Sequence, residues 1–241
     1  MPVLISTGVS ARHIHLSPEH LEALFGQDYA LTPKRELSIP GQYLCKERLR
    51  IEGPKGSMDN VAIIGPTRFR TQIEITSSDG IKLGVNPPIR LSGDLDGSEP
   101  VTLVGPKGKL ELDEGLIVAM RHIHMTEQNA TELGFRHKDY AMVIVPGPRS
   151  LVFDHVVVRV SPENVATELH IDTDEANTAS LKTGDKVNLL RINDKKIRIE
   201  RLINMFDERQ MKLIEACVAN IVEEERRKVS QMEDILARLR N

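Results

Sequence analysis

One six-residue pattern occurs twice in this chain, about half the chain apart: RHIHLS at 12–17 and RHIHMT at 121–126. In an extended strand, residues i and i+2 point to the same side. Each copy therefore places two imidazoles on one face of a strand, where they can bind a transition metal such as zinc. A lone His-x-His is more often the polar outer face of a strand. The duplication, with the same flanking arginine, favours a metal site.

The repeat continues into a helix start. Ser17 and Thr126 suit the N-cap position, and Pro18 and Glu127 suit the first turn of a helix. A third copy begins at His170, because residues 124–139 align without a gap with residues 170–185. We therefore expect three places where a histidine precedes a helix N-cap by two residues. The remaining histidines at 20, 137 and 155 lie outside this pattern and are interpreted as structural or solvent-facing.

Most of the chain up to about residue 200 consists of short β-branched or alternating runs separated by Gly and Pro. We expect strands at 61–64, 72–76, 101–104, 116–120, 142–145, 156–160 and 187–190. The two GPKG segments, at 53–56 and 105–108, lack the GxxxxGK[ST] pattern of a phosphate-binding loop and are interpreted as turns. This spacing is typical of small barrels or sandwiches.

Composition excludes several classes of partner. A net charge of -3 and 3% aromatic residues predict no nucleic-acid surface. No apolar run approaches the roughly 20 residues that span a bilayer, so we expect no membrane partner. Cys45 and Cys217 are far apart and form no CxxC, which suits a reducing cytoplasm. No leader precedes the first motif, so a cytoplasmic protein is expected.

A long helix is predicted from about residue 206 to 241. Apolar residues follow three-to-four spacing there, at 211, 214, 218, 221, 232, 235 and 239. Such a helix can form a coiled coil, giving a homo-oligomer, or can pack along its own domain. Both interpretations stay open.

Several segments taken together resemble the phosphate propanoyltransferases, also called PduL-type phosphotransacylases. They are VSARHIHLS (9–17), PGQ (40–42), GPKG (53–56), SGD (92–94), AMRHIHM (119–125) and HIDTDEAN (170–177). The resemblance covers roughly residues 3–190 in collinear order. It implies reversible conversion of a short acyl-CoA (acetyl or propanoyl) and inorganic phosphate to acyl phosphate and CoA.

The resemblance also implies a fold. We expect a mainly β protein with two small β-barrels capped by short helices. One barrel would combine residues 1–11 with 120–195, the other would comprise 12–119, and 206–241 would form a helical extension. Members packaged in bacterial microcompartments carry an N-terminal extension that is not seen before Gly8, so this route of encapsulation is not expected.

Position by position, the resemblance implies two zinc ions per chain. It assigns His13, His15 and Glu74 to one zinc and His122, His124 and His170 to the other. From the residues alone, Glu74 would be interpreted as a solvent-facing strand residue.

The remaining assignments concern the substrates. Arg68 would bind phosphate and act in catalysis, since a guanidinium can hold phosphate through two parallel hydrogen bonds. The backbone of Val9 and Ser10, with Lys55 and Asn177, would contact CoA. Direct attack of phosphate on the thioester needs no protein nucleophile, so a structural role is expected for Cys45.

Two other functions remain open at this point. His13, His15 and Glu19 fit the HxHx3E spacing of metal-dependent cupin oxygenases and isomerases, although Ser17-Pro18 predicts a helix start between them. A non-catalytic metal-containing scaffold protein, recruiting partners through its C-terminal helix, is the second alternative.

Overall fold

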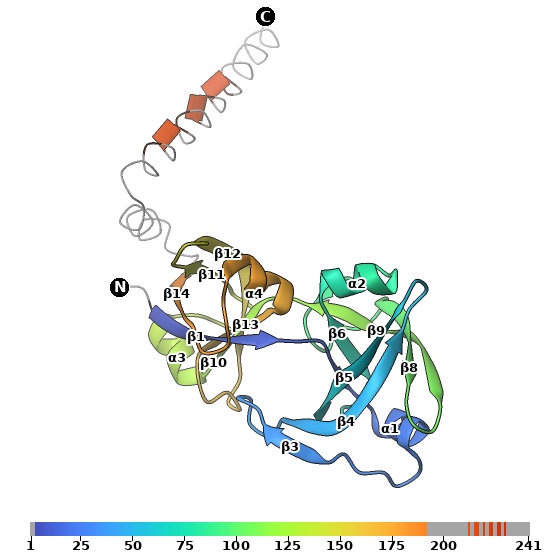
Figure 1. Ribbon diagram of the computed structural model, residues 1–241. Helices are drawn as coiled ribbons and strands as arrows, with labels where there is room; N and C mark the ends of the chain where they lie inside the picture. The colour runs from blue at the N-terminus through green and yellow to red at the C-terminus, as the bar shows by residue number, and fades with distance from the viewer. Residues whose placement is uncertain are drawn as a thin grey trace, which may run out of the picture. The chain divides into compact units, whose positions relative to one another are not determined.

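The computed structural model describes residues 3–191 and scattered helical positions between Lys212 and Val229. Residues Met1–Arg191 form one compact unit, and Ile192–Asn241 belong to a second unit. The first unit is mainly β, as the sequence predicts, with short helices at the strand ends (Figure 1). The helix expected over 206–241 lies largely outside the described residues and stays a prediction.

The first unit contains a closed barrel of six strands, here called barrel 1 (Figure 1). Each strand pairs with the next in the order β1, β13, β10, β12, β11 and β14, and β14 returns to β1. The bounds are β1 Val3–Ser10, β10 His122–Met125, β11 Tyr140–Val145, β12 Leu151–Val160, β13 Glu168–Asp172 and β14 Lys186–Arg191. The N-terminal strand thus completes a barrel made otherwise by the second half of the described residues.

The segment between β1 and β10 forms barrel 2, which closes through β8. That strand pairs with both β4 and β9, so β4, β5, β2, β6, β9 and β8 make a six-stranded ring. The bounds are β2 His13–His15, β4 Tyr43–Glu52, β5 Ser57–Gly65, β6 Gln72–Ile75, β8 Glu99–Val104 and β9 Lys109–Ala119, with β3 Pro33–Glu36 and β7 Ile89–Arg90 at the edges. The two-domain boundaries stay a prediction, because both barrels belong to one compact unit.

The two barrels share one pairing scheme. Strand β2 is parallel to β5 and antiparallel to β6, and β10 is likewise parallel to β12 and antiparallel to β13. The registers also agree, because His13 lies opposite Glu74 and His122 lies opposite His170. The two His-x-His strands, β2 and β10, therefore have equivalent neighbours in the two barrels.

Four short helices follow strands of these two barrels, and each begins with a side-chain cap. The helices are α1 Pro18–Phe25, α2 Ser77–Leu83, α3 Glu127–Leu133 and α4 Thr173–Ala179. Ser17, Thr76, Thr126 and Asp172 each accept a hydrogen bond from the backbone N–H three residues later. Sequence analysis predicted three of these helices and missed α2, where Ser-Ser-Asp-Gly is typical of a turn and glycine disfavours a helix interior.

Each barrel has its own apolar core. In barrel 2, Ile14 and Leu16 are fully buried, and in barrel 1 the equivalent Ile123 and Met125 are fully buried. Because neighbouring residues of a strand point to opposite faces, burial of these side chains turns the histidines between them away from the core. The histidines accordingly lie on the outer faces of the barrels.

Both GPKG segments are turns, as predicted, and each packs against the end of a helix. The N–H of Gly53 donates to Gly56 O at 2.8 Å, and that of Gly105 donates to Gly108 O at 2.9 Å. The first turn lies against Leu83 at the end of α2, and the second lies against Leu24 at the end of α1. Among the described residues, no helix is long and apolar enough to cross a membrane.

Replacement of Gly105 by alanine is expected to destabilise barrel 2. The added Cβ would lie 2.6 Å from the carbonyl oxygen of Leu24, so the turn or α1 must move. Such overpacking costs about 1–3 kcal/mol. Gly108→Ala, in the same turn, is the matched control, because its Cβ would meet Ala23 O at an ordinary 3.7 Å. Equal free energies of unfolding for the two variants in urea denaturation would contradict this role.

Candidate functional site

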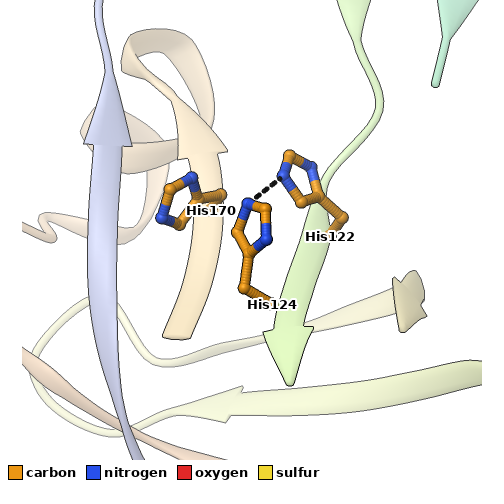
Figure 2. Close-up of side chains that lie close together, drawn as sticks. All are labelled: His122, His124 and His170. Atoms are coloured by element: carbon orange, nitrogen blue, oxygen red, sulfur yellow. Dashed lines mark hydrogen bonds between the residues drawn. The ribbon is translucent and has the colours of Figure 1, made fainter. Parts of the chain in front are cut away.

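Three histidines of barrel 1 form a compact cluster. His122 and His124 project from β10, and His170 projects from the neighbouring strand β13 (Figure 2). The Nε2 atoms of His122 and His124 are 3.1 Å apart. One potential ligand atom from each of the three residues lies within 4.8 Å of the others. The β10–β13 register, and not sequence proximity, brings His170 to the His-x-His pair.

Barrel 2 builds the equivalent cluster from His13, His15 and Glu74, whose ligand atoms also lie within 4.8 Å of one another. His13 Nε2 is 3.4 Å from Glu74 Oε2. Glu74 stands on β6 where His170 stands on β13, and each comes two residues before a helix N-cap. Glu74 is therefore the fourth member of the repeated strand–helix unit, with a carboxylate replacing the imidazole.

The hydrogen bonds of the imidazoles suit metal binding. The Nδ1 atoms of His13, His15 and His122 lie 2.9–3.1 Å from the backbone oxygens of Ala11, Ile64 and Met120. His124 Nδ1 lies 3.1 Å from the side-chain oxygen of Asn164. A proton on each Nδ1 leaves the Nε2 lone pair free, and a second interaction of this kind is typical of metal-bound histidine.

His170 is oriented differently from the other four imidazoles. Its Nε2 lies 2.7 Å from a carboxylate oxygen of Glu168, two residues earlier on β13, so Nδ1 is the nitrogen left for a ligand. Gly8 on β1 makes room for this ring, because a Cβ there would lie 2.8 Å from His170 Nε2. The Ser38 hydroxyl of barrel 2 donates to the same Glu168 carboxylate at 2.9 Å.

Burial keeps several of these imidazoles neutral. Loss of solvent, together with the charges of His13 and Arg68, lowers the pKa of His15 to about 2. Burial and the neighbouring His170 lower the pKa of His124 to about 4, and the pKa of His122 falls well below its usual value for the same reasons. Neutral imidazole is the form that binds a metal, so both clusters have donor sets that fit zinc.

The arginine that precedes each His-x-His motif forms an ion pair with the helix behind the third ligand. Arg12 holds Asp79 of α2 through two hydrogen bonds of 2.7 and 2.8 Å. Arg121 Nε lies 2.7 Å from Glu175 of α4. Asp79 follows Glu74 by five residues, and Glu175 follows His170 by five residues. The ion pairs are thus equivalent, and each ties a His-x-His strand to the strand that carries its third ligand.

A second polar network connects Arg68 with Glu74. The guanidinium of Arg68 donates to Ser92 Oγ at 3.2 Å, and Gln72 Nε2 donates to the same oxygen at 2.8 Å. Gln72 Nε2 also lies 2.5 Å from Glu74 Oε1, and the side-chain oxygen of Gln72, Oε1, accepts a hydrogen bond from the backbone N–H of Gly93. Gln72 is buried, so this network fixes Arg68 and Glu74 relative to each other.

One cleft of about 860 Å³ contains both clusters and Arg68. Val9 and Ser10, expected near CoA, also line it. Lys55 and Asn177 do not belong to the lining: Lys55 is exposed in the β4–β5 turn, and Asn177 is exposed on α4. The structure therefore brings together nine of the eleven expected site residues and leaves these two outside the cleft.

Sequence analysis missed several residues that support the clusters. Glu168, Asn164 and Gln72 each hydrogen-bond a candidate metal ligand, and Gly8 accommodates one. A glycine inside a β-branched strand signals close approach of another group, so Gly8 was detectable in principle. Glu168 and Gln72 each lie two residues before their partner on the same strand, so the i, i+2 spacing was a local signal for them as well. The contact of Asn164 with His124 joins distant segments and has no local sequence signal.

The cupin interpretation and a nucleophilic cysteine both lose their structural basis. Glu19 is exposed on α1, outside the strand that carries His13 and His15, so the HxHx3E residues form no ligand set. Cys45 is buried in the core of barrel 2, and burial raises the pKa of its thiol to about 11. The thiol is therefore protonated at neutral pH, as expected for a structural residue.

Loss of Arg12 is expected to destabilise the protein more than loss of Arg121. The Asp79 side chain is only 2% exposed, whereas that of Glu175 is 21% exposed. Arg12→Ala leaves Asp79 as a buried carboxylate without its main partner, at a cost of about 1–3 kcal/mol. For Arg121→Ala we expect about 1 kcal/mol or less. Urea denaturation at pH 7 measures both, and an equal or reversed order would contradict the assignment.

The stabilisation by the Arg12–Asp79 ion pair is expected to depend on pH. Burial alone would raise the pKa of Asp79, but hydrogen bonds and charge from Arg12 lower it overall. A lowered carboxyl pKa contributes stability above the unfolded value of about 3.9, and this contribution is lost as the pH falls through the folded pKa. The stability difference between wild type and Arg12→Ala should therefore shrink below about pH 4.

Comparison with known proteins identifies the family of the chain. The family model for phosphate propanoyltransferase matches residues 6–182. Phosphate propanoyltransferase of Thermotoga maritima is 51% identical over 187 residues, which cover 77% of this chain and 89% of that protein. The Listeria monocytogenes protein of the same name is 48% identical over 192 residues, 78% of this chain and 90% of its own length. That of Clostridioides difficile is 46% identical over 187 residues, covering 78% and 89%. The chain therefore belongs to the phosphate propanoyltransferase family.

Proposed function

We propose that this protein transfers a short acyl group reversibly between CoA and inorganic phosphate. The observation that carries the proposal is the convergence of two ligand clusters and Arg68 on one cleft, in a chain of this family. Its volume of about 860 Å³ suits a small-molecule site. In the forward direction, a phosphate oxygen forms a bond to the acyl carbon, the carbon–sulfur bond breaks, and CoA leaves with acyl phosphate as the other product.

We further propose that each cluster holds one zinc ion. Two nitrogens bound tetrahedrally to zinc at about 2.0–2.1 Å lie roughly 3.3 Å apart, close to the 3.1 Å between His122 Nε2 and His124 Nε2. The donors are three imidazoles at one site and two imidazoles with a carboxylate at the other, and zinc accepts both kinds of ligand. When bound, zinc supplies Lewis-acid stabilisation of a carbonyl oxygen and an affinity for sulfur.

The protein's own contribution is to gather and orient a highly charged nucleophile. Arg68 is partly buried, and burial lowers the pKa of its guanidinium, although the group stays charged at neutral pH. Its hydrogen bond to Ser92 limits the rotation of the side chain. A fixed, desolvated guanidinium binds phosphate strongly and holds it in one orientation, which lowers the entropic cost of attack.

Acyl-CoA would enter along β1. Val9 and Ser10 line the cleft there, and the N–H of Val9 donates to Thr183 Oγ1 at 3.1 Å. Arg35 and Arg48 also line the cleft and provide positive charge for the phosphates of CoA. We expect these two arginines to contact the nucleotide end, while contact of CoA with Lys55 and Asn177, outside the cleft, stays a prediction.

Metal analysis tests the two-site proposal. Protein purified without chelator is expected to contain close to two zinc ions per chain. The double variant His13→Ala/His15→Ala should lose one and keep the other, because the second cluster uses only residues of barrel 1. His137→Ala, an exposed histidine outside both clusters, should keep two. Wild-type protein without bound transition metal, by inductively coupled plasma mass spectrometry, would refute the proposal.

Steady-state kinetics test the role of Arg68. Arg68→Ala should raise the KM for phosphate about 10- to 100-fold while changing the KM for acyl-CoA little, because the guanidinium binds the small dianion. Arg68→Lys should recover little, since an ammonium lacks the planar fork. Arg70→Ala is the matched control: Arg70 forms ion pairs with Asp96 and Glu114 and does not line this cleft. A raised acyl-CoA KM with a normal phosphate KM would show that Arg68 serves the other substrate.

A further inference from the structure

A second arginine, Arg159, enters the same cleft from the opposite barrel. It stands on β12, directly beside His124 of β10 in the parallel register. The side chain of Asn164 contacts both neighbours: its Nδ2 donates to Arg159 O at 2.9 Å, and its Oδ1 lies 3.1 Å from His124 Nδ1. The backbone of Arg159 is therefore held against a candidate metal ligand.

The guanidinium of Arg159 lacks hydrogen-bond and ion-pair partners among the described residues. Within residues 3–191 it has no hydrogen bond or salt bridge, although it is withdrawn from solvent enough to lower its pKa. The negative charge that favours its charged form is that of Glu74. Glu74 is also the carboxylate that favours the charged form of Arg68. A single carboxylate, itself part of a metal-ligand cluster, thus faces two partly buried cations.

The two arginines also repel each other. The charge of Arg159 disfavours the charged form of Arg68, and it likewise disfavours protonation of His122 and His124. Two desolvated guanidiniums that share one carboxylate are unfavourable without an anion between them. A doubly charged phosphate removes that repulsion and satisfies the donors of both side chains.

Resting on the proposed function, we propose that Arg159 is a second phosphate-binding catalytic residue, which forms a clamp with Arg68 around the attacking phosphate. Arg68 comes from barrel 2 and is held by Ser92, whereas Arg159 comes from barrel 1 and is held at its backbone by Asn164. Each barrel then contributes one ligand cluster and one arginine. The equivalent position beside His15 on β5 is Ile64, so this cation is specific to barrel 1.

The test compares Arg159→Gln and Arg159→Lys with wild type, using the full-length, metal-loaded protein. Arg149→Gln is the matched control, because Arg149 is exposed in the β11–β12 turn and outside the cleft. Isothermal titration calorimetry with inorganic phosphate alone measures Kd, and steady-state assays measure the KM of each substrate. We expect Arg159→Gln to weaken phosphate about 10- to 100-fold and to leave the acyl-CoA KM within about twofold. Arg159→Lys should restore part of the loss.

A double variant shows whether both arginines bind the same anion. If they do, Arg68→Ala/Arg159→Gln should weaken phosphate by less than the product of the two single effects. An unchanged phosphate Kd in Arg159→Gln, a rise confined to the acyl-CoA KM, or strictly multiplicative effects would each overturn the clamp. So would a loss of phosphate binding in Arg159→Gln that is accompanied by loss of metal, because Arg159 would then act by positioning His124.

Failure of the proposed function would look different. Wild-type protein that binds phosphate but does not consume acyl-CoA in its presence would refute acyl transfer. The calorimetric comparison of Arg159→Gln with wild type would still decide whether the clamp exists.

Discussion

Four buried apolar side chains, Leu16, Ile75, Met125 and Ile171, determine where the candidate metal ligands point. Each one follows a ligand residue and precedes a helix N-cap. Since successive residues of a strand face opposite sides, packing of the apolar side chain in a barrel core forces its predecessor outward. The N-cap then ends the strand and starts a helix. Packing of the barrel cores thus sets the direction of the ligand side chains, and the same arrangement occurs at four places.

Charge is distributed unevenly around these ligands. Arg12 and Arg121 have carboxylate partners on α2 and α4, and these ion pairs tie strands to helices. In the cleft, burial lowers the pKa values of His15, His122 and His124, which keeps these imidazoles neutral, and Arg68 and Arg159 lack carboxylates of their own. A polar cleft whose guanidiniums have no carboxylate of their own attracts an anion. This pattern suits a reaction whose nucleophile is a phosphate dianion.

Much of the fold could be predicted from sequence because its signals are local. Alternating apolar residues indicated the strands, and Ser17, Thr126 and Asp172 indicated three of the four helix starts. Glu74 was misjudged when its strand was considered alone, because a lone carboxylate on an alternating strand resembles a solvent-facing residue. Family resemblance assigned it to the site. Its equivalence to His170 became visible only when the strand pairings of the two barrels could be compared.

The sequence by itself determined the repeated unit of strand, cap and helix, since each part depends on residues a few positions apart. Tertiary structure decided which units meet. Closure of barrel 1 brings Gly8 against His170, and parallel pairing brings Arg159 beside His124. It also left Lys55 and Asn177 outside the cleft. These contacts join segments that are distant in the chain, and their geometry depends on barrel closure, which no local periodicity encodes.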